Sequence, residues 1–367
     1  MRNGAVAIIF GTRPELVKLA PLIAPLGAAA TVIHTGQHSP TVLAPIARDL
    51  GLDDPSVALA APTGPPRTQI HRMVERLAPL LAQAAPEVVV VQGDTNSTLA
   101  GALAAAAVGL PIVHVEAGLR AGDPALPEEH NRVLVDHLAT RLCAPTETAR
   151  AHLLAEGIPA HRIAVTGNTV VDAAIAALAP AAERDRFLAR HALRRDEYVV
   201  ATFHRQENVD DPARLTEILA ALHAVDGPVV FPVHPRTRDR MRHHGLDGTG
   251  GDLRLIDPLG YRDFLALEAD CALVISDSGG VQEEASVFGR PVIVVRRSTE
   301  RPEVLGTVAR LVPDVGQVAA TANELLAQRA AILGRLAILE SPYGDGTAGA
   351  QCVEIVTRLV AHAAHTG

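Results

Sequence analysis

The chain alternates short, largely apolar segments with longer segments rich in alanine and leucine, and this alternation restricts its fold more than any other feature. The apolar segments at residues 5–10, 88–91, 112–115 and 163–166 are partly β-branched, and turn residues lie beside them. Strands that are apolar on both faces and are followed by helices indicate a parallel sheet covered by helices on both sides. The first half of the sequence therefore predicts an α/β domain.

The same alternation starts again in the second half of the chain, with apolar runs at residues 198–203, 229–233, 253–256, 272–276 and 291–295. Residues 172–195 between the two series are alanine-rich and then charged, which is typical of a helix and a linker. A chain of 367 residues also exceeds the roughly 250–300 residues of a single core. We predict two Rossmann-like, doubly wound domains, residues 1–172 and 195–352, with a last helix at 353–367 that could pack on the first. Two such domains that face each other would bind a ligand between them, at the carboxyl ends of their strands.

Bulk composition excludes several classes of protein. The net charge is −8 and no long Lys/Arg run occurs, which argues against binding to nucleic acid or to an anionic membrane. Three widely spaced cysteines show neither a disulfide framework nor metal-ligand spacing. The apolar run at residues 5–10 is too short to span a membrane and lacks a signal-peptide layout. We therefore expect a soluble, cytoplasmic protein.

The turn at residues 11–18 follows the first predicted strand and contains Arg13, Pro14 and Lys18. Proline suits the first turn of a helix, and the start of a helix after a strand presents N–H groups and a positive dipole end to an anion. Lys18 is the single lysine of an arginine-rich chain, at a position where a point charge could be required instead of a planar fork. The alternative is an ordinary turn between a strand and a helix.

Carboxylates follow two predicted strands of the first domain. Asp94 comes after residues 88–91, where it could also serve as a helix cap, and Glu116 comes after residues 112–115. Glu128 and Arg132 lie four residues apart and share a helix face, although such a pair can be a surface ion pair of little energetic value. We expect Asp94, Glu116 and Glu128 to converge on one cleft, where clustered carboxylates raise one another's pKa values and allow acid and base catalysis at neutral pH.

In the second half, His204 and Arg205 end a predicted strand, where they could contact an anion or act as a base, or His204 could be a core residue. Several signatures are absent from the sequence: a Gly-x-Gly-x-x-Gly turn, a Walker A loop and a His-Glu-x-x-His zinc motif. We therefore predict no nicotinamide or flavin cofactor and no metal.

A glycine-containing turn, Ser278, Gly279 and Gly280, follows the predicted strand at residues 272–276. Glycines allow a close approach of the backbone to a ligand, and a serine at a helix start can donate hydrogen bonds. Glu284 in the following helix is placed to accept hydrogen bonds from a ribose diol. Arg301 could add a positive charge for phosphates.

Together, five segments resemble the non-hydrolysing UDP-N-acetylglucosamine 2-epimerase family: residues 11–18, 93–98, 115–120 with 127–132, 203–208, and 277–284 with 299–302. The resemblance extends over residues 5–312. It implies a GT-B-like fold, a UDP-sugar substrate, no added cofactor and a homodimer. Matched residue by residue, the family's catalytic positions fall on Asp94, Glu116, Glu128, Arg132 and His204. Its nucleotide-sugar contacts fall on Arg13, Lys18, Leu259, Phe264, Ser278, Gly279, Gly280, Glu284 and Arg301.

The resemblance also implies a reaction: inversion at C2 of UDP-N-acetylglucosamine, by anti elimination of UDP to 2-acetamidoglucal and re-addition. Gln37, His38 and Arg67 match a site at which bacterial members bind a second, activating UDP-sugar, but Pro40 stands where those members carry a polar residue. Residues 204–208 also differ from the best-known bacterial pattern, so a modified substrate such as a UDP-2,3-diacetamido uronic acid stays open. Hydrolytic epimerisation and GT-B glycosyl transfer are further alternatives.

Overall fold

The computed structural model describes residues 1–61, 64–246, 248 and 250–366. The chain forms two compact units: unit 1 comprises Met1–Ala176 and Tyr343–Gly367, and unit 2 comprises Ala177–Pro342. Residues 343–352, which we expected in the second domain, thus belong to unit 1. The chain leaves unit 1 once and returns to it with its last helix.

Unit 1 is built on a seven-stranded, wholly parallel sheet with the order β3-β2-β1-β4-β5-β6-β7. All five residues of β4, four valines and a glutamine, are buried, as is expected of a strand covered on both faces. The strands are β1 (Val6–Phe10), β2 (Ala30–His34), β3 (Val57–Ala58), β4 (Val88–Gln92), β5 (Ile112–Val115), β6 (Arg141–Ala144) and β7 (Ile163–Val165).

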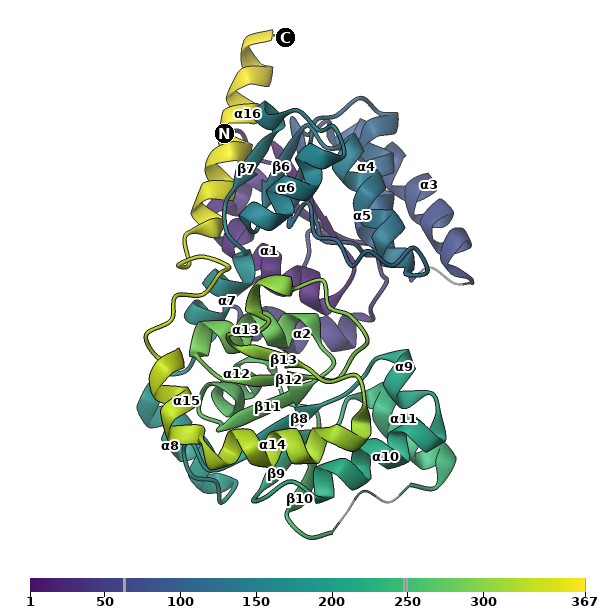
Figure 1. Ribbon diagram of the computed structural model, residues 1–367. Helices are drawn as coiled ribbons and strands as arrows, with labels where there is room; N and C mark the ends of the chain where they lie inside the picture. Colours follow the sequence, from purple (N-terminus) through teal and green to yellow (C-terminus); the bar gives the residue numbers. More distant parts are fainter. Residues whose placement is uncertain (62–63, 247, 249, 367) are drawn as a thin grey trace. The chain divides into compact units, whose positions relative to one another are not determined.

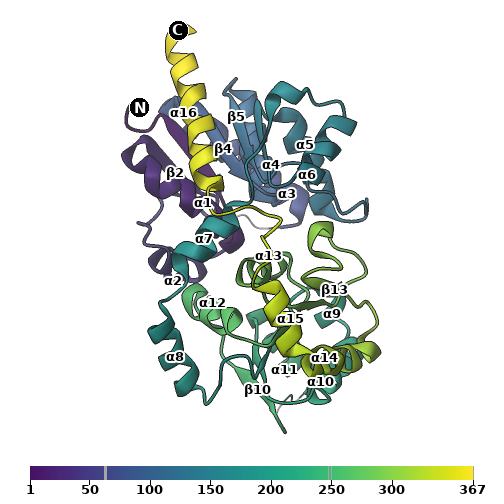
Figure 2. The same ribbon diagram turned by 60° about the vertical axis from the view of Figure 1, so that its left-hand side comes forward.

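Helices cover both faces of this sheet, and α16 packs beside α1, so the two ends of the sequence lie together (Figure 1, Figure 2). The contact is close: a Cβ atom on Gly349 would lie 2.5 Å from the Cβ of Pro21. The helices are α1 (Arg13–Leu26), α2 (Pro40–Asp49), α3 (Pro66–Ala84), α4 (Asn96–Ala107), α5 (Pro127–Leu138), α6 (Glu147–Ala155), α7 (Thr169–Ala177) and α16 (Ala348–Thr366), with 3-10 turns at Gly27–Ala29 and Ala160–Arg162.

Unit 2 has a second wholly parallel sheet, with six strands in the order β10-β9-β8-β11-β12-β13. The strands are β8 (Val199–Thr202), β9 (Val229–Pro232), β10 (Leu253–Ile256), β11 (Leu273–Ser276), β12 (Val292–Val294) and β13 (Ala309–Leu311). Alternate strand residues such as Ala201 and Phe231 form one apolar core with α10, α11 and α14. On another side of unit 2, α12 packs against α8 and α13.

The helices of unit 2 are α8 (Ala181–Arg190), α9 (Gln206–Val209), α10 (Pro212–His223), α11 (Pro235–His244), α12 (Tyr261–Ala269), α13 (Gly279–Phe288), α14 (Val318–Ala327) and α15 (Arg329–Leu336), with 3-10 turns at Pro302–Val304 and Val315–Gln317. Proline stands in the first turn of α10 and α11, where its missing N–H costs no hydrogen bond. No helix in the described part of the chain is long and apolar enough to cross a membrane.

The predicted α/β class is confirmed, and each strand predicted from an apolar run forms in the structure. The sequence analysis did not find β2, β3, β6 and β13. β3 and β13 have only two and three residues, and β6 begins with the charged Arg141. β2 is only partly buried. None of the four therefore shows a long apolar run. Residues 172–195, predicted as a helix and a linker, contain the end of α7 and all of α8.

Candidate active site

Asp94 and Glu116 lie beside each other in the fold because they follow neighbouring strands. Gln92 of β4 is paired with Val115 of β5, and the N–H of Gly93 donates to the carbonyl of Val115 at 3.0 Å. Both acids therefore stand at the carboxyl edge of the unit 1 sheet, where parallel α/β proteins carry their ligand sites.

Glu116 is held in an unusual backbone conformation. Its φ of 67° is in the left-handed region, which costs a non-glycine residue about 1–3 kcal/mol and occurs mostly at functional sites. The buried carboxylate forms an ion pair with Lys18 of α1 and accepts a hydrogen bond from the Asn168 amide at 2.8 Å. Asn168 in turn donates its own N–H to the carbonyl of Tyr343, 2.8 Å away. Contacts from distant segments thus fix the position of this carboxylate.

Asp94 is paired with Arg132, a buried residue of α5. The other side of the Arg132 guanidinium contacts Glu129 at 2.7 Å, and the Asn131 amide donates to the Asp94 carbonyl at 2.8 Å. Glu129 also accepts hydrogen bonds from the backbone N–H of Ala121, at 3.0 Å. Arg132 therefore joins the Asp94 turn to the loop before α5.

Glu128, the partner that we expected for Arg132, is exposed in the first turn of α5. Glu129, Arg132 and Asp136 recur at helical spacing and are at least half-buried, whereas Glu128 lies one residue away from that face. The neighbouring glutamate thus forms the described ion pair, at i, i+3 spacing. A search for i, i+3 pairs as well as i, i+4 pairs would have found it.

The Gly11 turn is tied to the Asp94 turn through Glu15 of α1. The Glu15 carboxylate accepts from the N–H of Thr12 at 2.8 Å, and from the hydroxyls of Thr95 at 2.9 Å and Thr98 at 3.1 Å. Burial raises the pKa of Glu15 to about 7, although these hydrogen bonds lower it. At Gly11 itself a Cβ atom would lie 1.9 Å from the Ser97 hydroxyl oxygen, so no other residue fits there.

A second buried network supports the turns that carry Asp94 and Glu116. His114 lies 2.7 Å from Asp136 through Nδ1 and 2.9 Å from the Gly93 carbonyl through Nε2. The imidazole of His114 thus connects the Asp136 carboxylate of α5 to the carbonyl of the Gly93 turn. Burial raises the pKa of Asp136, but His114 and Arg120 hold it below the ordinary value. Asp136 also accepts from the Gly118 N–H at 3.2 Å, two residues after Glu116.

Gln37 and His38 also contact this part of unit 1. The Gln37 side-chain oxygen accepts from the N–H of Ser97 at 3.1 Å, and Nδ1 of His38 accepts from the Arg13 N–H at 3.2 Å. Burial, followed by the nearby His34 and Arg13, lowers the pKa of His38. Arg67 lies exposed in the first turn of α3, and Pro40 is the first residue of α2.

In unit 2, His204 follows β8 and is 38% exposed. Its Nδ1 lies 3.2 Å from the buried carboxylate of Asp277, which also accepts from the Arg205 N–H at 3.0 Å and the Asn208 amide at 3.0 Å. Burial raises the pKa of Asp277, but these contacts, that with His204 above all, keep it below the usual range. Asp277 is therefore an ionised group that orients the imidazole.

Ser278, Gly279 and Gly280 form the start of α13, and Arg301 lies against them. A Cβ atom on Gly279 would be 3.3 Å from the Arg301 guanidinium carbon, whereas at Gly280 it would meet open space. Two buried carboxylates hold Arg301: Glu283 at 2.8 Å and Glu300 at 2.8 Å. The helix start, the open glycine and the fixed guanidinium form a site suited to a phosphate group.

Glu284 is buried in the first turns of α13, and a second carboxyl faces it from α12. That group, Glu268, is fully buried, and neither carboxyl oxygen has a hydrogen-bond partner among the described residues. Burial and the Glu284 charge raise the pKa of Glu268 well above its ordinary value. Leu259 and Phe264 lie half-buried, after β10 and in α12.

The sequence analysis missed the groups that hold the proposed site residues: Glu15, Glu129, Asn168, Asp277, Glu283 and Glu300. Each lies within or next to a recognised segment. Some partners are distant in sequence, as with Asn168 and Glu116, 52 residues apart, whereas Glu129 is three residues from Arg132. These residues could have been found as polar residues at positions that strand or helix periodicity predicts to be buried, because a buried polar group needs a hydrogen-bond partner.

The carboxyl edge of the unit 1 sheet carries ion-paired carboxylates, and that of the unit 2 sheet carries a glycine turn with a fixed arginine. This arrangement defines a two-domain α/β enzyme of the GT-B-like class. Residues 26–357 match the family model described as UDP-N-acetylglucosamine 2-epimerase. The chain belongs to this family, whose members are isomerases.

Individual relatives agree with this assignment. The UDP-N-acetylglucosamine 2-epimerase of Methanocaldococcus jannaschii is 38% identical, over 96% of this chain and 98% of the relative. The UDP-2,3-diacetamido-2,3-dideoxy-D-glucuronate 2-epimerase of Pseudomonas aeruginosa is 35% identical, over 96% and 99%. A crystal structure of the M. jannaschii enzyme in complex with UDP-GlcNAc and UDP has a TM-score of 0.83 at 38% identity, and covers 96% of this chain and 99% of that chain.

Proposed function

We propose that this protein interconverts UDP-N-acetylglucosamine and UDP-N-acetylmannosamine without net hydrolysis. The observation that carries the proposal is the pair of cation-held carboxylates at the edge of the unit 1 sheet, Glu116 with Lys18 and Asp94 with Arg132. Inversion at C2 requires one group that removes a proton and another that returns one on the opposite face, and two fixed carboxylates can supply both. Membership of the epimerase family supports the same reaction.

The proposed reaction is an elimination followed by an addition. A base in unit 1 takes the C2 proton while the C1–O bond to UDP breaks, which leaves 2-acetamidoglucal and UDP. UDP then adds back to C1, and a proton is delivered to the other face of C2. Asp94, Glu116 and Glu128 are the proposed acids and bases, with Arg132 orienting Asp94.

Unit 2 is proposed to bind the nucleotide. Ser278, Gly279 and Gly280 offer backbone N–H groups to the diphosphate, and Arg301 and His204 offset the charge that develops on departing UDP. Glu284 would accept from the ribose hydroxyls, and Leu259 and Phe264 would contact the base. In unit 1, Arg13 and Lys18 add positive charge.

The remaining expectations belong to the same proposal: a homodimer that works in the cytoplasm, and Gln37, His38 and Arg67 as contacts for an activating UDP-sugar. The hydrogen bonds that Ser97 donates to Gln37 and Arg13 donates to His38 support a link between that segment and the Gly11 turn.

The test is NMR of the purified protein with UDP-N-acetylglucosamine in D2O. We expect deuterium at C2 and a mixture of the two epimers, while Asp94→Asn and Glu116→Gln prevent exchange. Glu354→Gln, which changes an exposed carboxylate of α16, is the matched control and should exchange like the parent. Accumulating free UDP would indicate hydrolysis instead. Consumption of the UDP-sugar that requires a sugar acceptor and puts no deuterium at C2 would indicate a glycosyltransferase.

A second substrate is favoured by one specific observation. The relative named for a UDP-2,3-diacetamido glucuronate is almost as similar to this chain as the M. jannaschii enzyme, at 35% against 38% identity. The same exchange experiment with that uronic acid compares the two substrates directly. If C2 exchange is faster with the UDP-diacetamido sugar than with UDP-N-acetylglucosamine, the diacetamido sugar becomes the proposed substrate.

A further inference from the structure

A cavity of about 280 Å³ lies inside unit 1, between α2, α1 and the strands β1 and β2. Protein interiors are close-packed, and voids larger than a water molecule are few. An apolar cavity of about 150 Å³ is already large enough to hold benzene. This space is therefore large enough for a small organic molecule.

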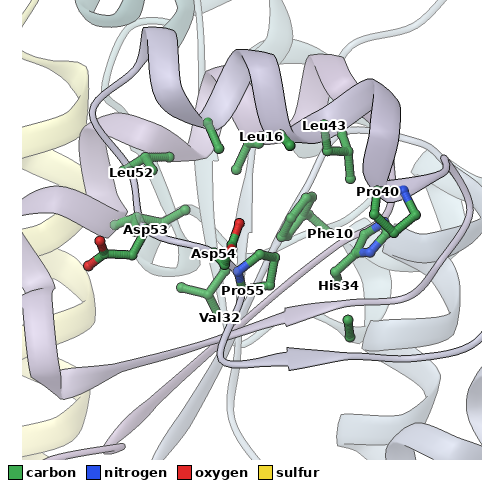
Figure 3. Close-up of a pocket in the computed structure, with 14 residues that line it drawn as sticks. Phe10, Leu16, Val32, His34, Pro40, Leu43, Leu52, Asp53, Asp54 and Pro55 are labelled. Atoms are coloured by element: carbon green, nitrogen blue, oxygen red, sulfur yellow. The ribbon is translucent and has the colours of Figure 1, made fainter.

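The residues that line the cavity are apolar apart from His34, Asp53 and Asp54 (Figure 3). Phe10 and Leu43 contribute to the apolar surface, and the ring centroids of Phe10 and His34 lie 5.2 Å apart. Asp53 and Asp54 are exposed residues of the loop that lines the cavity, and Figure 3 shows the Asp54 carboxylate directed towards the space and that of Asp53 directed away.

His34 provides a polar atom that lacks a partner. The residue is 1% exposed, and no hydrogen bond to its Nε2 occurs among the described residues. Burial lowers the pKa of His34, so the ring is neutral, while the carbonyls of Gly11 and His38 act in the opposite sense. We assign the ring proton to Nδ1, which leaves a bare acceptor at Nε2. An unsatisfied buried acceptor destabilises the folded protein, and a ligand that donates a hydrogen bond to it would remove that cost.

We propose that this cavity is a second ligand site, which takes a small apolar molecule carrying one hydrogen-bond donor, such as an alcohol or a primary amine. The apolar body fills the space under α2, and its donor bonds Nε2 of His34. The carboxylates of Asp53 and Asp54 disfavour an anion. A UDP-sugar is anionic and larger than the space, and residues proposed for its binding, such as Arg13 and Glu116, do not line it.

Binding of four probes of one shape tests the proposal: benzyl alcohol, benzylamine, toluene and benzoate. Ligand-observed NMR and calorimetry are performed on the whole chain without a UDP-sugar, so a negative result leaves the epimerase proposal intact. We expect saturable binding of the alcohol and the amine, toluene to bind about fivefold more weakly for the loss of one hydrogen bond, and benzoate not to bind.

Variants place the probes in the cavity. Ala47→Phe, at a buried α2 position in the wall, should fill the space and abolish binding. His34→Phe keeps a ring beside Phe10 and should remove the preference for benzyl alcohol over toluene, which tests the site even if Ala47→Phe does not fold. Asp54→Asn should weaken the binding of benzylamine, whereas the matched variant Asp53→Asn should leave that binding unchanged.

Three results would overturn the proposal: no saturable binding of the alcohol or the amine, unchanged binding in a folded Ala47→Phe variant, or equal affinity for benzyl alcohol and toluene in the parent protein.

Discussion

The two units use the same pair of chemical groups in opposite roles. In unit 1, the cations Lys18 and Arg132 hold the carboxylates Glu116 and Asp94. In unit 2, buried carboxylates hold the basic side chains: Asp277 orients the imidazole of His204, and Glu283 and Glu300 hold the guanidinium of Arg301. In each unit, the side chain that we propose to act on the substrate is held in place by a buried partner. Unit 1 is thus suited to moving protons and unit 2 to binding an anion.

Removing the fixed carboxylates should have the largest effect. Glu116→Gln and Asp94→Asn keep the size of each side chain but remove the base, so we expect turnover to fall about 10²–10⁴-fold. The measurement is the rate of deuterium incorporation at C2, with UDP affinity as the second readout. If either variant lost UDP affinity while the rate at saturating substrate persisted, the division of roles between the units would be wrong.

Arg301→Lys should instead act on binding. Lysine cannot keep the two-sided contact with Glu283 and Glu300, so the cation is no longer fixed beside Gly279. Losing a charge-assisted hydrogen bond of about 1.5–3 kcal/mol predicts a KM roughly 10–100-fold higher, with a smaller change in kcat. Arg310→Lys, which changes an exposed ion pair with Glu324, is the control. A fall in kcat alone would contradict the assignment of Arg301 to the nucleotide.

Glu15→Gln tests the link between the Gly11 turn and the Asp94 turn. The amide replaces one acceptor oxygen by a donor that faces other donors, and a loss of about 1–2 kcal/mol predicts roughly tenfold lower kcat. Because burial raises the pKa of Glu15 to about 7, activity of the parent should fall as the pH drops through that value. The free energy of unfolding should change in the opposite direction: the raised pKa means that the Glu15 contribution to stability is lost as pH rises from about 4.5 to about 7. A variant that keeps the acid limb of the pH–activity profile would exclude Glu15 as its origin.

Glu268→Gln should have the smallest effect, an increase in stability. Since the folded-state pKa of Glu268 is raised, its contribution to stability is complete below the unfolded pKa and is lost as the pH rises. Glutamine does not titrate, so the Tm difference from the parent should be near zero at pH 4 and grow to a few degrees at pH 8, corresponding to about 1 kcal/mol. Thermal unfolding monitored across that range measures it. A difference that is the same at every pH would show that Glu268 is not an unusual titrating group.

Most of the fold was predictable because apolar runs, turns and helix starts are local patterns. The strands from β1 to β12 that consist of continuous apolar residues were found, and the ends of β4 and β5 correctly located Asp94 and Glu116. The edge strand β3 has two residues, and a segment of that length carries no periodic signal. Glu128 shows the limit within a helix: its spacing to Arg132 was right for a pair, but packing turned Glu129 towards the arginine.

The partners of buried polar groups were not predictable, because they come together only through the order of strands and the packing of helices. Lys18 and Glu116 are 98 residues apart, yet α1 and the end of β5 place them in contact. The neighbouring thiol of Cys352 and burial together raise the pKa of Cys143, although the two cysteines are far apart in the sequence.

The amino-acid sequence by itself thus determined the α/β class, the turns that carry chemistry and the family of the protein, because strand and helix periodicity and short motifs are encoded within a few neighbouring residues. Only the tertiary structure decided which cation holds which carboxylate, that the last helix returns to unit 1, and that a cavity with an unpartnered imidazole nitrogen lies under α2. Those features depend on distances between segments far apart in the chain, which strand order and side-chain packing set.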